Sequence, residues 1–222
     1  MKQQLFRCNL LLLALLLFST MRIFASTEIT TEQALDSLKV GNQRFVKLNP
    51  SHLDYDKQIE HTKDGQHPFV AVLSCMDSRV PPEIIFDQGI GSVFVVREAG
   101  NITSPNSLGS LEYAVNVKKV KLVVVLGHSK CGAVEAAVNK AELGEYKNLE
   151  QLIEQIKPAV SNCSDNIYQC TEKNNVKMSI ASILKNSSPI AKAVKNNEVK
   201  IIGAYYDVAT GVVTFDKEYT SK

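Results

Sequence analysis

The residues best able to do chemistry in this chain are two cysteines and a histidine. Cys75 opens the block Cys-Met-Asp-Ser-Arg, and His128 and Cys131 belong to the later block His-Ser-Lys-Cys. Two thiolates and one imidazole form a ligand set that suits zinc, and three protein ligands leave the fourth tetrahedral position open for reaction. The sequence therefore predicts one catalytic zinc ion per chain, bound by these three side chains.

A carboxylate and a guanidinium follow the first cysteine closely. Asp77 and Arg79 lie on the same short turn as Cys75. Such a pair contributes little when it lies alone on a surface. Beside a metal, however, a carboxylate held by a guanidinium can accept a proton from bound water. We therefore predict that Asp77 and Arg79 form a catalytic dyad next to the metal.

Continuous apolar runs precede both blocks and predict buried strands. Residues 69–74 end directly before Cys75, and residues 121–126 end shortly before His128. A third run covers residues 93–96. Strands buried on both faces of a parallel sheet have this composition. Because α/β sheets place their sites beyond the carboxyl ends of the strands, we expect the two blocks to meet at one edge of a sheet.

Segments with helical spacing alternate with the predicted strands. These segments cover residues 30–47, 106–117, 131–138, 149–160 and 176–194. The first opens with a Thr cap signal and is predicted as an N-terminal helical arm, and residues 200–206 with 212–215 are predicted as a closing hairpin. The predicted fold class is therefore α/β, with a central mainly parallel β-sheet flanked by helices.

The first 25 residues are typical of a secretory signal peptide. Lys2 and Arg7 precede an aliphatic run over residues 10–18, and a usable cleavage site precedes Ser26. The apolar run is about half of the ~20 residues that a spanning helix needs, which favours cleavage over a retained anchor. We expect a single domain over residues 26–222, exported to a bacterial periplasm and not attached to a membrane.

The charge of the chain argues against one class of partner. The formal net charge is +2, and Lys2, Arg7 and Arg22 would leave with the signal peptide. A near-neutral mature chain without a basic block lacks the electrostatic footprint of nucleic-acid binding. We therefore expect no nucleic-acid partner.

Two further cysteines remain after the predicted cleavage. Cys163 and Cys170 lie in a polar stretch between two predicted helices. Exported proteins meet an oxidising compartment, where a pair this close in sequence is expected to be joined. We predict a Cys163–Cys170 disulfide, and we expect metal coordination to protect the thiolates of Cys75 and Cys131.

Four blocks of the sequence resemble those of the β-class carbonic anhydrases. They are Ser-Cys-Met-Asp-Ser-Arg-Val-Pro-Pro-Glu (74–83), Phe-Val-Val-Arg-Glu-Ala-Gly-Asn (94–101), Gly-Ser-Leu-Glu-Tyr-Ala-Val (109–115) and Gly-His-Ser-Lys-Cys-Gly-Ala-Val (127–134). The resemblance covers most of residues 31–215. The family's zinc ligands fall on Cys75, His128 and Cys131, and its Asp/Arg dyad falls on Asp77 and Arg79.

The resemblance implies a β-carbonic anhydrase-like catalytic domain. The implied reaction is the zinc-dependent, reversible hydration of carbon dioxide to bicarbonate and a proton, in a homodimer or a tetramer of dimers with the site near the subunit interface. In some members the aspartate is a fourth zinc ligand in a closed resting form, a role that would fall on Asp77. A tryptophan-containing bicarbonate pocket locks that form in some of them, and this chain has no Trp. A glutamine that lines the carbon dioxide pocket in other members falls on Gln88.

Two other classes of protein compete with the enzyme hypothesis. A structural or binding zinc protein could keep the metal without turnover, but a closed structural site would need neither Asp77 nor Arg79. A thiol redox protein could use Cys75 and Cys131, but neither belongs to a Cys-x-x-Cys pair. A measurement of carbon dioxide hydration before and after zinc removal distinguishes the enzyme from both.

Overall fold

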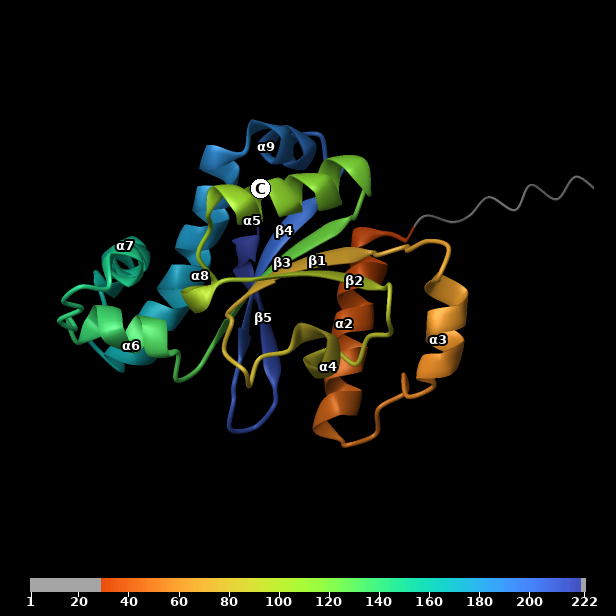
Figure 1. Cartoon of the computed structure of the whole chain (residues 1–222), viewed down its shortest axis with the longest axis horizontal. Helices are drawn as coiled ribbons and strands as arrows, with labels where there is room; N and C mark the ends of the chain where they lie inside the picture. The colour runs from red at the N-terminus through yellow and green to blue at the C-terminus, as the bar shows by residue number, and fades with distance from the viewer. Residues whose placement is uncertain (1–28, 221–222) are drawn as a thin grey trace, which may run out of the picture.

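A five-stranded sheet forms the centre of the computed structural model, which describes residues 29–220 (Figure 1). The strand order is β2-β1-β3-β4-β5, and β5 alone runs antiparallel to its neighbour. The strands are β1 (Val70–Ser74), β2 (Val93–Arg97), β3 (Leu122–His128), β4 (Lys200–Tyr206) and β5 (Val213–Thr220). The predicted mainly parallel sheet and its closing hairpin are confirmed.

Helices cover both faces of the sheet and extend beyond one end. They are α2 (Thr31–Val46), α3 (Tyr55–Thr62), α4 (Pro82–Ile85), α5 (Pro105–Glu112), α6 (Gly132–Val138), α7 (Lys147–Ile156), α8 (Ile167–Asn186) and α9 (Ser188–Lys195). Short helical segments are η1 (Ala99–Asn101), η2 (Tyr113–Val117) and η3 (Lys157–Val160). One face packs against α5, α8 and α9, and the other packs against α2 and α4.

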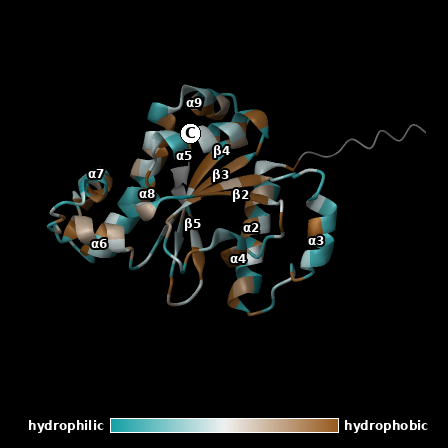
Figure 2. Cartoon of the chain, in the orientation of Figure 1, coloured by the Kyte–Doolittle hydropathy of each residue, from teal (hydrophilic) through white to brown (hydrophobic). Residues whose placement is uncertain are grey.

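The composition of the strands accounts for this layering. Every residue of β1 and β3 is buried, as expected for central strands covered by helices on both faces. In Figure 2 these strands are hydrophobic along most of their length, whereas hydrophilic residues gather on the outer helices. β2 lies at the edge and is only half-buried along most of its length. A third apolar cluster, formed mainly by α6 and α7, lies beyond the strand ends and includes Cys75 and Cys131.

The N-terminal helix begins where its cap signal predicts. Thr30 accepts a hydrogen bond from the main chain of Gln33, whose side chain bonds back to Thr30. The helix α2 predicted as an arm packs on the sheet with Ala34 and Leu38 fully buried. α3, which follows it, has no buried residue and lies outside this layer.

The predicted single helix over residues 176–194 is wrong. The structure has two helices here, because Pro189 cannot donate the next main-chain hydrogen bond and Ser187 caps the new helix α9. α8 also begins earlier than predicted, at Ile167, with the side chain of Asn166 accepting a hydrogen bond from Gln169 N. The polar composition of this first part of α8 concealed its helical spacing.

The described cysteines separate into one bridge and two free thiols. Cys163 and Cys170 are joined by a disulfide, as predicted, and Cys75 and Cys131 are free. The bridge does not lie wholly in a connecting loop, because Cys170 belongs to the first turn of α8. The disulfide therefore ties the start of α8 to the segment that follows η3.

The predicted signal peptide, residues 1–25, lies outside the described residues. Among the helices of residues 29–220, none combines the length and the apolar character that a bilayer span requires. The longest of them, α8, has 20 residues and carries lysine and asparagine along its length.

A buried polar side chain of α2 connects this helix to the end of α4 and to the turn between β4 and β5. Asn42 is buried, donates to the carbonyl oxygens of Ile85 and Gly211, and accepts from the main chain of Val213. Gly41 has no room for a side chain, since a Cβ would lie 1.7 Å from the carbonyl oxygen of Phe86. This close approach fixes α2 against α4 and the β4–β5 turn.

The buried Asp87 is expected to make the fold acid-sensitive. Burial alone would raise its pKa, but hydrogen bonds from Arg44 and Ser51 outweigh burial and hold the pKa of Asp87 below its usual range. The carboxylate of Asp87 therefore stabilises the fold fully at pH values above its pKa in the unfolded chain, about 3.9. This stabilisation is lost as the pH falls through the lower pKa that Asp87 has in the folded protein. Asp87→Asn should lower the free energy of unfolding at pH 7 by about 2 kcal/mol.

Denaturant unfolding of both proteins between pH 7 and pH 2 measures this effect. The difference between wild type and Asp87→Asn should shrink towards acid pH. Asp36→Asn is the matched control, because Asp36 lies on the same helix as Arg44, pairs with Lys39 and is exposed. A constant difference across the pH range would show that the ionised form of Asp87 does not stabilise the fold.

Candidate metal centre

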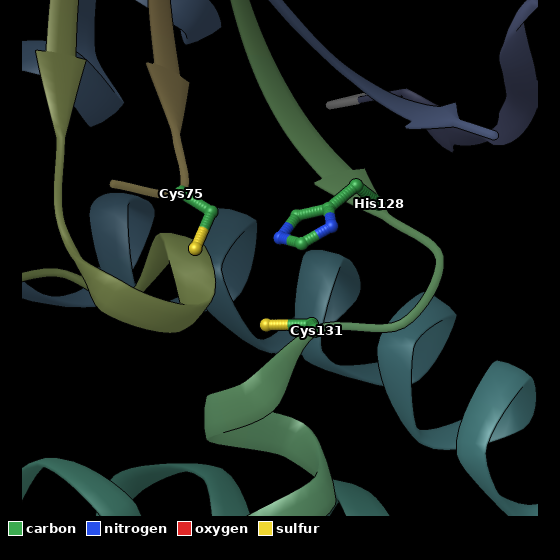
Figure 3. A group of neighbouring side chains, drawn as sticks. All are labelled: Cys75, His128 and Cys131. Carbon is green, nitrogen blue, oxygen red and sulfur yellow. The ribbon is translucent and has the colours of Figure 1, made fainter. Parts of the chain in front are cut away.

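The carboxyl ends of two neighbouring strands carry the predicted ligands. Cys75 follows the last residue of β1, and His128 is the last residue of β3, which pairs with β1. Cys131 is the N-cap residue of α6. In Figure 3 the three side chains point toward one another from these elements. The parallel register of β1 and β3 therefore places both blocks at the same edge of the sheet, as the sequence predicts.

The three side chains form a compact, buried donor set. The sulfur atoms of Cys75 and Cys131 and a ring nitrogen of His128 all lie within 4.8 Å of one another. The three residues are between 1% and 4% exposed. Zinc binds thiolate sulfur at about 2.3 Å and imidazole nitrogen at about 2.0 Å, so one ion can reach all three atoms across this distance. The donor set fits zinc in both chemistry and size.

His128 is held in one orientation and presents a free nitrogen. Its Nδ1 lies 2.9 Å from the carbonyl oxygen of Ser129, so Nδ1 carries the proton and donates it. Nε2 is buried without a hydrogen-bond partner among the described residues. A buried nitrogen without a partner is costly, and a metal ion would supply the missing interaction.

Cys75 and Cys131 differ in their affinity for the proton. Hydrogen bonding from Cys131, opposed by burial and aided by His128, lowers the pKa of the Cys75 thiol to about 4. The neighbouring Cys75 sulfur and burial raise the pKa of Cys131 well above its usual range. The two neighbouring sulfurs therefore favour loss of a first proton and oppose loss of a second, and metal binding, which needs both thiolates, would release the remaining proton.

Asp77 and Arg79 form a bidentate ion pair beside this cluster. Arg79 donates from Nε to Oδ1 of Asp77 at 2.9 Å and from Nη2 to Oδ2 at 2.7 Å. Hydrogen bonding from Arg79 lowers the pKa of Asp77 to about 2, so the carboxylate is ionised at neutral pH. The main-chain N–H of Asp77 donates to the sulfur of Cys75 at 3.4 Å. The predicted dyad therefore adjoins the predicted metal ligands.

Two arginines support the turn that carries Cys75 and Asp77. Arg97, at the end of β2, donates to the carbonyl oxygen of Cys75 at 3.1 Å and to that of Asp77 at 2.5 Å. Arg79 reaches the second block as well, donating from Nη2 to the carbonyl oxygen of Lys130 at 3.0 Å. Arg97 is not among the site residues that the sequence predicts, although it ends the strand next to β1 and so lies at the edge where the site was expected.

Gln88 lies between α2 and the segment after α4. Its side-chain nitrogen donates to the carbonyl oxygen of Phe86 at 2.7 Å and to that of Ser37 at 3.4 Å. These bonds fasten α2 to the loop. A role for Gln88 in lining a carbon dioxide pocket stays a prediction.

Comparisons of the sequence with known proteins identify relatives that are carbonic anhydrases. Residues 70–213 match the family model described as carbonic anhydrase. Carbonic anhydrase 2 from Mycobacterium tuberculosis is 38% identical over 188 residues, which cover 80% of this chain and 89% of that protein. A carbonic anhydrase from Mycolicibacterium smegmatis is 37% identical over 81% of this chain and 90% of that protein.

Solved structures share the fold over most of the chain. A tetrameric β-carbonic anhydrase from Sordaria macrospora has a TM-score of 0.64 and 27% identity, covering 84% of this chain and 96% of that one. A β-carbonic anhydrase from Aspergillus fumigatus has a TM-score of 0.64 and 28% identity, covering 84% of this chain and 90% of that one. The chain therefore belongs to the carbonic anhydrase family, in its β class. It is an enzyme that catalyses the reversible hydration of carbon dioxide to bicarbonate and a proton.

Proposed function

We propose that Cys75, His128 and Cys131 bind the zinc ion on which this reaction depends. The observation that carries the proposal is the buried cluster of two thiols and an imidazole, with Nε2 of His128 lacking any other partner among the described residues. When bound, zinc would acidify a water molecule so that hydroxide is available at neutral pH. The protein's own part is to hold and orient the reactants around this position.

We propose that Asp77 orients the attacking hydroxide. Its carboxylate stays ionised because Arg79 lowers its pKa to about 2, so it can accept a hydrogen bond while a lone pair of the hydroxide points at carbon dioxide. Arg79 bonds both oxygens of Asp77. This pairing would keep the carboxylate of Asp77 off a bound metal, whereas the closed resting form would need Asp77 as a fourth ligand.

X-ray absorption at the zinc edge of the purified protein tests the ligand assignment directly. Two sulfur and one or more nitrogen or oxygen scatterers per zinc are expected, with zinc bound at one ion per chain. A shell without sulfur would mean that the metal binds elsewhere.

We propose that the active form is a homodimer or a tetramer of dimers. The edge strand β2 supports this, since an edge strand offers unpaired main-chain groups to another chain. A groove of about 850 Å³ runs beside it, and its lining includes Phe94, Arg97 and Tyr113. Because Arg97 also supports Cys75 and Asp77, this edge adjoins the metal centre. Sedimentation of the purified enzyme should give an even number of chains, and a stable active monomer would contradict the proposal.

We propose that the protein is exported, with residues 1–25 removed, and acts in a bacterial periplasm as one catalytic domain over residues 26–222. The disulfide between Cys163 and Cys170 supports an oxidising compartment. Mass analysis of the protein recovered from the periplasm of the source bacterium should give a chain that begins at Ser26. An uncleaved chain confined to the cytoplasm would contradict export.

A further inference from the structure

A buried acid, Glu172, lies directly behind one of the proposed zinc ligands. Glu172 belongs to α8 and is 4% exposed. Its Oε1 accepts a hydrogen bond from the main-chain N–H of Cys131 at 3.3 Å, and its Oε2 accepts one from the hydroxyl of Tyr205 at 2.6 Å. Both of these donors are neutral. Burying a carboxylate is costly, so its presence here calls for a role beyond filling space.

The peptide group between Lys130 and Cys131 is held at both ends. Its carbonyl oxygen accepts from Nη2 of Arg79 at 3.0 Å, and its N–H donates to Glu172. Lys130 has a φ of +56°, in the left-handed region that is unfavourable for a residue with a side chain. A turn of this kind persists only when surrounding bonds hold it. The direction of the Cys131 side chain follows from the orientation of this peptide.

The helix α8, which carries Glu172, also supports the thiol of Cys75. Asn175, less than one turn after Glu172, donates to the carbonyl oxygen of Gly100 at 2.5 Å. The N–H of Gly100 in turn donates to the sulfur of Cys75 at 3.3 Å. The disulfide at Cys170 ties down the start of α8 just ahead of these residues. α8 therefore supports the main chain next to Cys131 through Glu172 and, through Asn175 and Gly100, the sulfur of Cys75.

We propose that Glu172 is a positioning residue that fixes the sulfur of Cys131 for metal binding by accepting the N–H of Cys131. The proposal rests on the zinc ligands proposed above. Partners of this kind, which act behind metal ligands, typically change metal affinity by about 10- to 100-fold when removed. Glu172→Ala should therefore release metal at least about tenfold faster than the wild type, because it leaves the N–H of Cys131 without an acceptor. Glu172→Gln keeps an acceptor oxygen in the same place and should restore most of the retention.

The test uses protein loaded with Co²⁺, whose absorption reports the ligands and their geometry. Thiolate-to-cobalt charge-transfer bands and the rate of Co²⁺ release to excess chelator are measured for the wild type and for Glu172→Ala, Glu172→Gln and Tyr205→Phe. We expect altered bands and fast release in Glu172→Ala, near-normal behaviour in Glu172→Gln, and an intermediate release rate in Tyr205→Phe. Asp87→Asn is the matched control, because it removes a buried carboxylate elsewhere and should change stability without changing the bands.

Two results would overturn the proposal while leaving the zinc ligands intact. One is a wild-type cobalt spectrum and release rate in Glu172→Ala. The other is release from Glu172→Gln as fast as from Glu172→Ala, which would assign the effect to charge and not to the hydrogen bond. Absence of thiolate charge-transfer bands in the wild type would instead show that the proposed ligands are wrong, and the role of Glu172 with them.

Discussion

Cys131→Ser is expected to remove both the bound zinc and the hydration of carbon dioxide. Ligand sulfur must be deprotonated to bind the metal, and a serine hydroxyl does not ionise near neutral pH. The remaining Cys75 and His128 would leave the ion with two protein ligands in place of three. Elemental analysis after gel filtration should find almost no zinc in this variant, with carbon dioxide hydration close to the uncatalysed rate.

The double variant Cys163→Ser/Cys170→Ser is the matched control for this loss. It removes two sulfur atoms, one more than Cys131→Ser, but from a disulfide outside the ligand cluster. It should keep one zinc per chain, and its free energy of unfolding should fall by at most about 2–3 kcal/mol, the chain-entropy contribution of so short a loop. Stoichiometric zinc in Cys131→Ser would show that Cys131 is not a ligand.

Asp77→Asn is expected to keep the metal and lose most of the turnover. The amide has nearly the same shape as the carboxylate but no negative charge with which to accept a hydrogen bond from the attacking hydroxide. Groups that handle protons in a transition state contribute about 100-fold or more to rate. A fall in kcat of roughly this size, with zinc content unchanged, should appear in stopped-flow hydration assays.

Arg79 is expected to matter through the position of Asp77. Arg79→Ala removes the two side-chain hydrogen bonds to the carboxylate and the bond to Lys130 but keeps the main-chain bond to Oδ1, so Asp77 is held less firmly and can approach the metal. Arg79→Lys keeps the charge but cannot make the bidentate contact, and it should recover only part of the rate. Asp64→Asn changes an exposed acid outside the site and should leave the rate unchanged. Near-normal rates in both Asp77→Asn and Arg79→Ala would rule out the dyad.

The sheet and the ligand cluster could be predicted from the sequence because their signals are local. The runs at residues 69–74 and 121–126 are apolar except for Ser74 and Lys121 at their ends, as is typical of strands buried on both faces. Parallel pairing then brings their carboxyl ends together, and with them Cys75 and His128. Because two thiolates and one imidazole suit zinc, the residue types then predicted that this edge of the sheet holds a metal centre.

The supporting groups could not be predicted because they depend on packing between distant segments. Glu172 is separated from Cys131 by three helical segments, α6, α7 and η3, and by the loops between them. The polar residues around Glu172 also hide the helical spacing of α8. Arg97 bonds the main-chain oxygens of Cys75 and Asp77. Every residue has a main-chain oxygen, so no pattern of residue types in the sequence could indicate these contacts. A helix predicted from residue 167 onwards would have included Glu172. It would not have shown that Glu172 packs against the metal centre.

The link from Arg79 to Lys130 explains why the dyad and the ligands form one unit. A single guanidinium holds the carboxylate of Asp77 and the peptide that precedes Cys131. A displacement of the block that carries His128 and Cys131 would therefore also shift Arg79, and with it the carboxylate of Asp77. This coupling is consistent with the close packing of both blocks at one edge of the sheet.

Stopped-flow hydration of carbon dioxide with a pH indicator tests the central claim most directly. It should be measured on the purified enzyme, on the same enzyme after zinc is removed by a chelator, and after one equivalent of zinc is restored. We predict rapid hydration that disappears with the metal and returns with it, reaching its full value at one zinc per chain. Hydration that is absent from the zinc-loaded enzyme, or that persists undiminished in the zinc-free protein, would contradict the account.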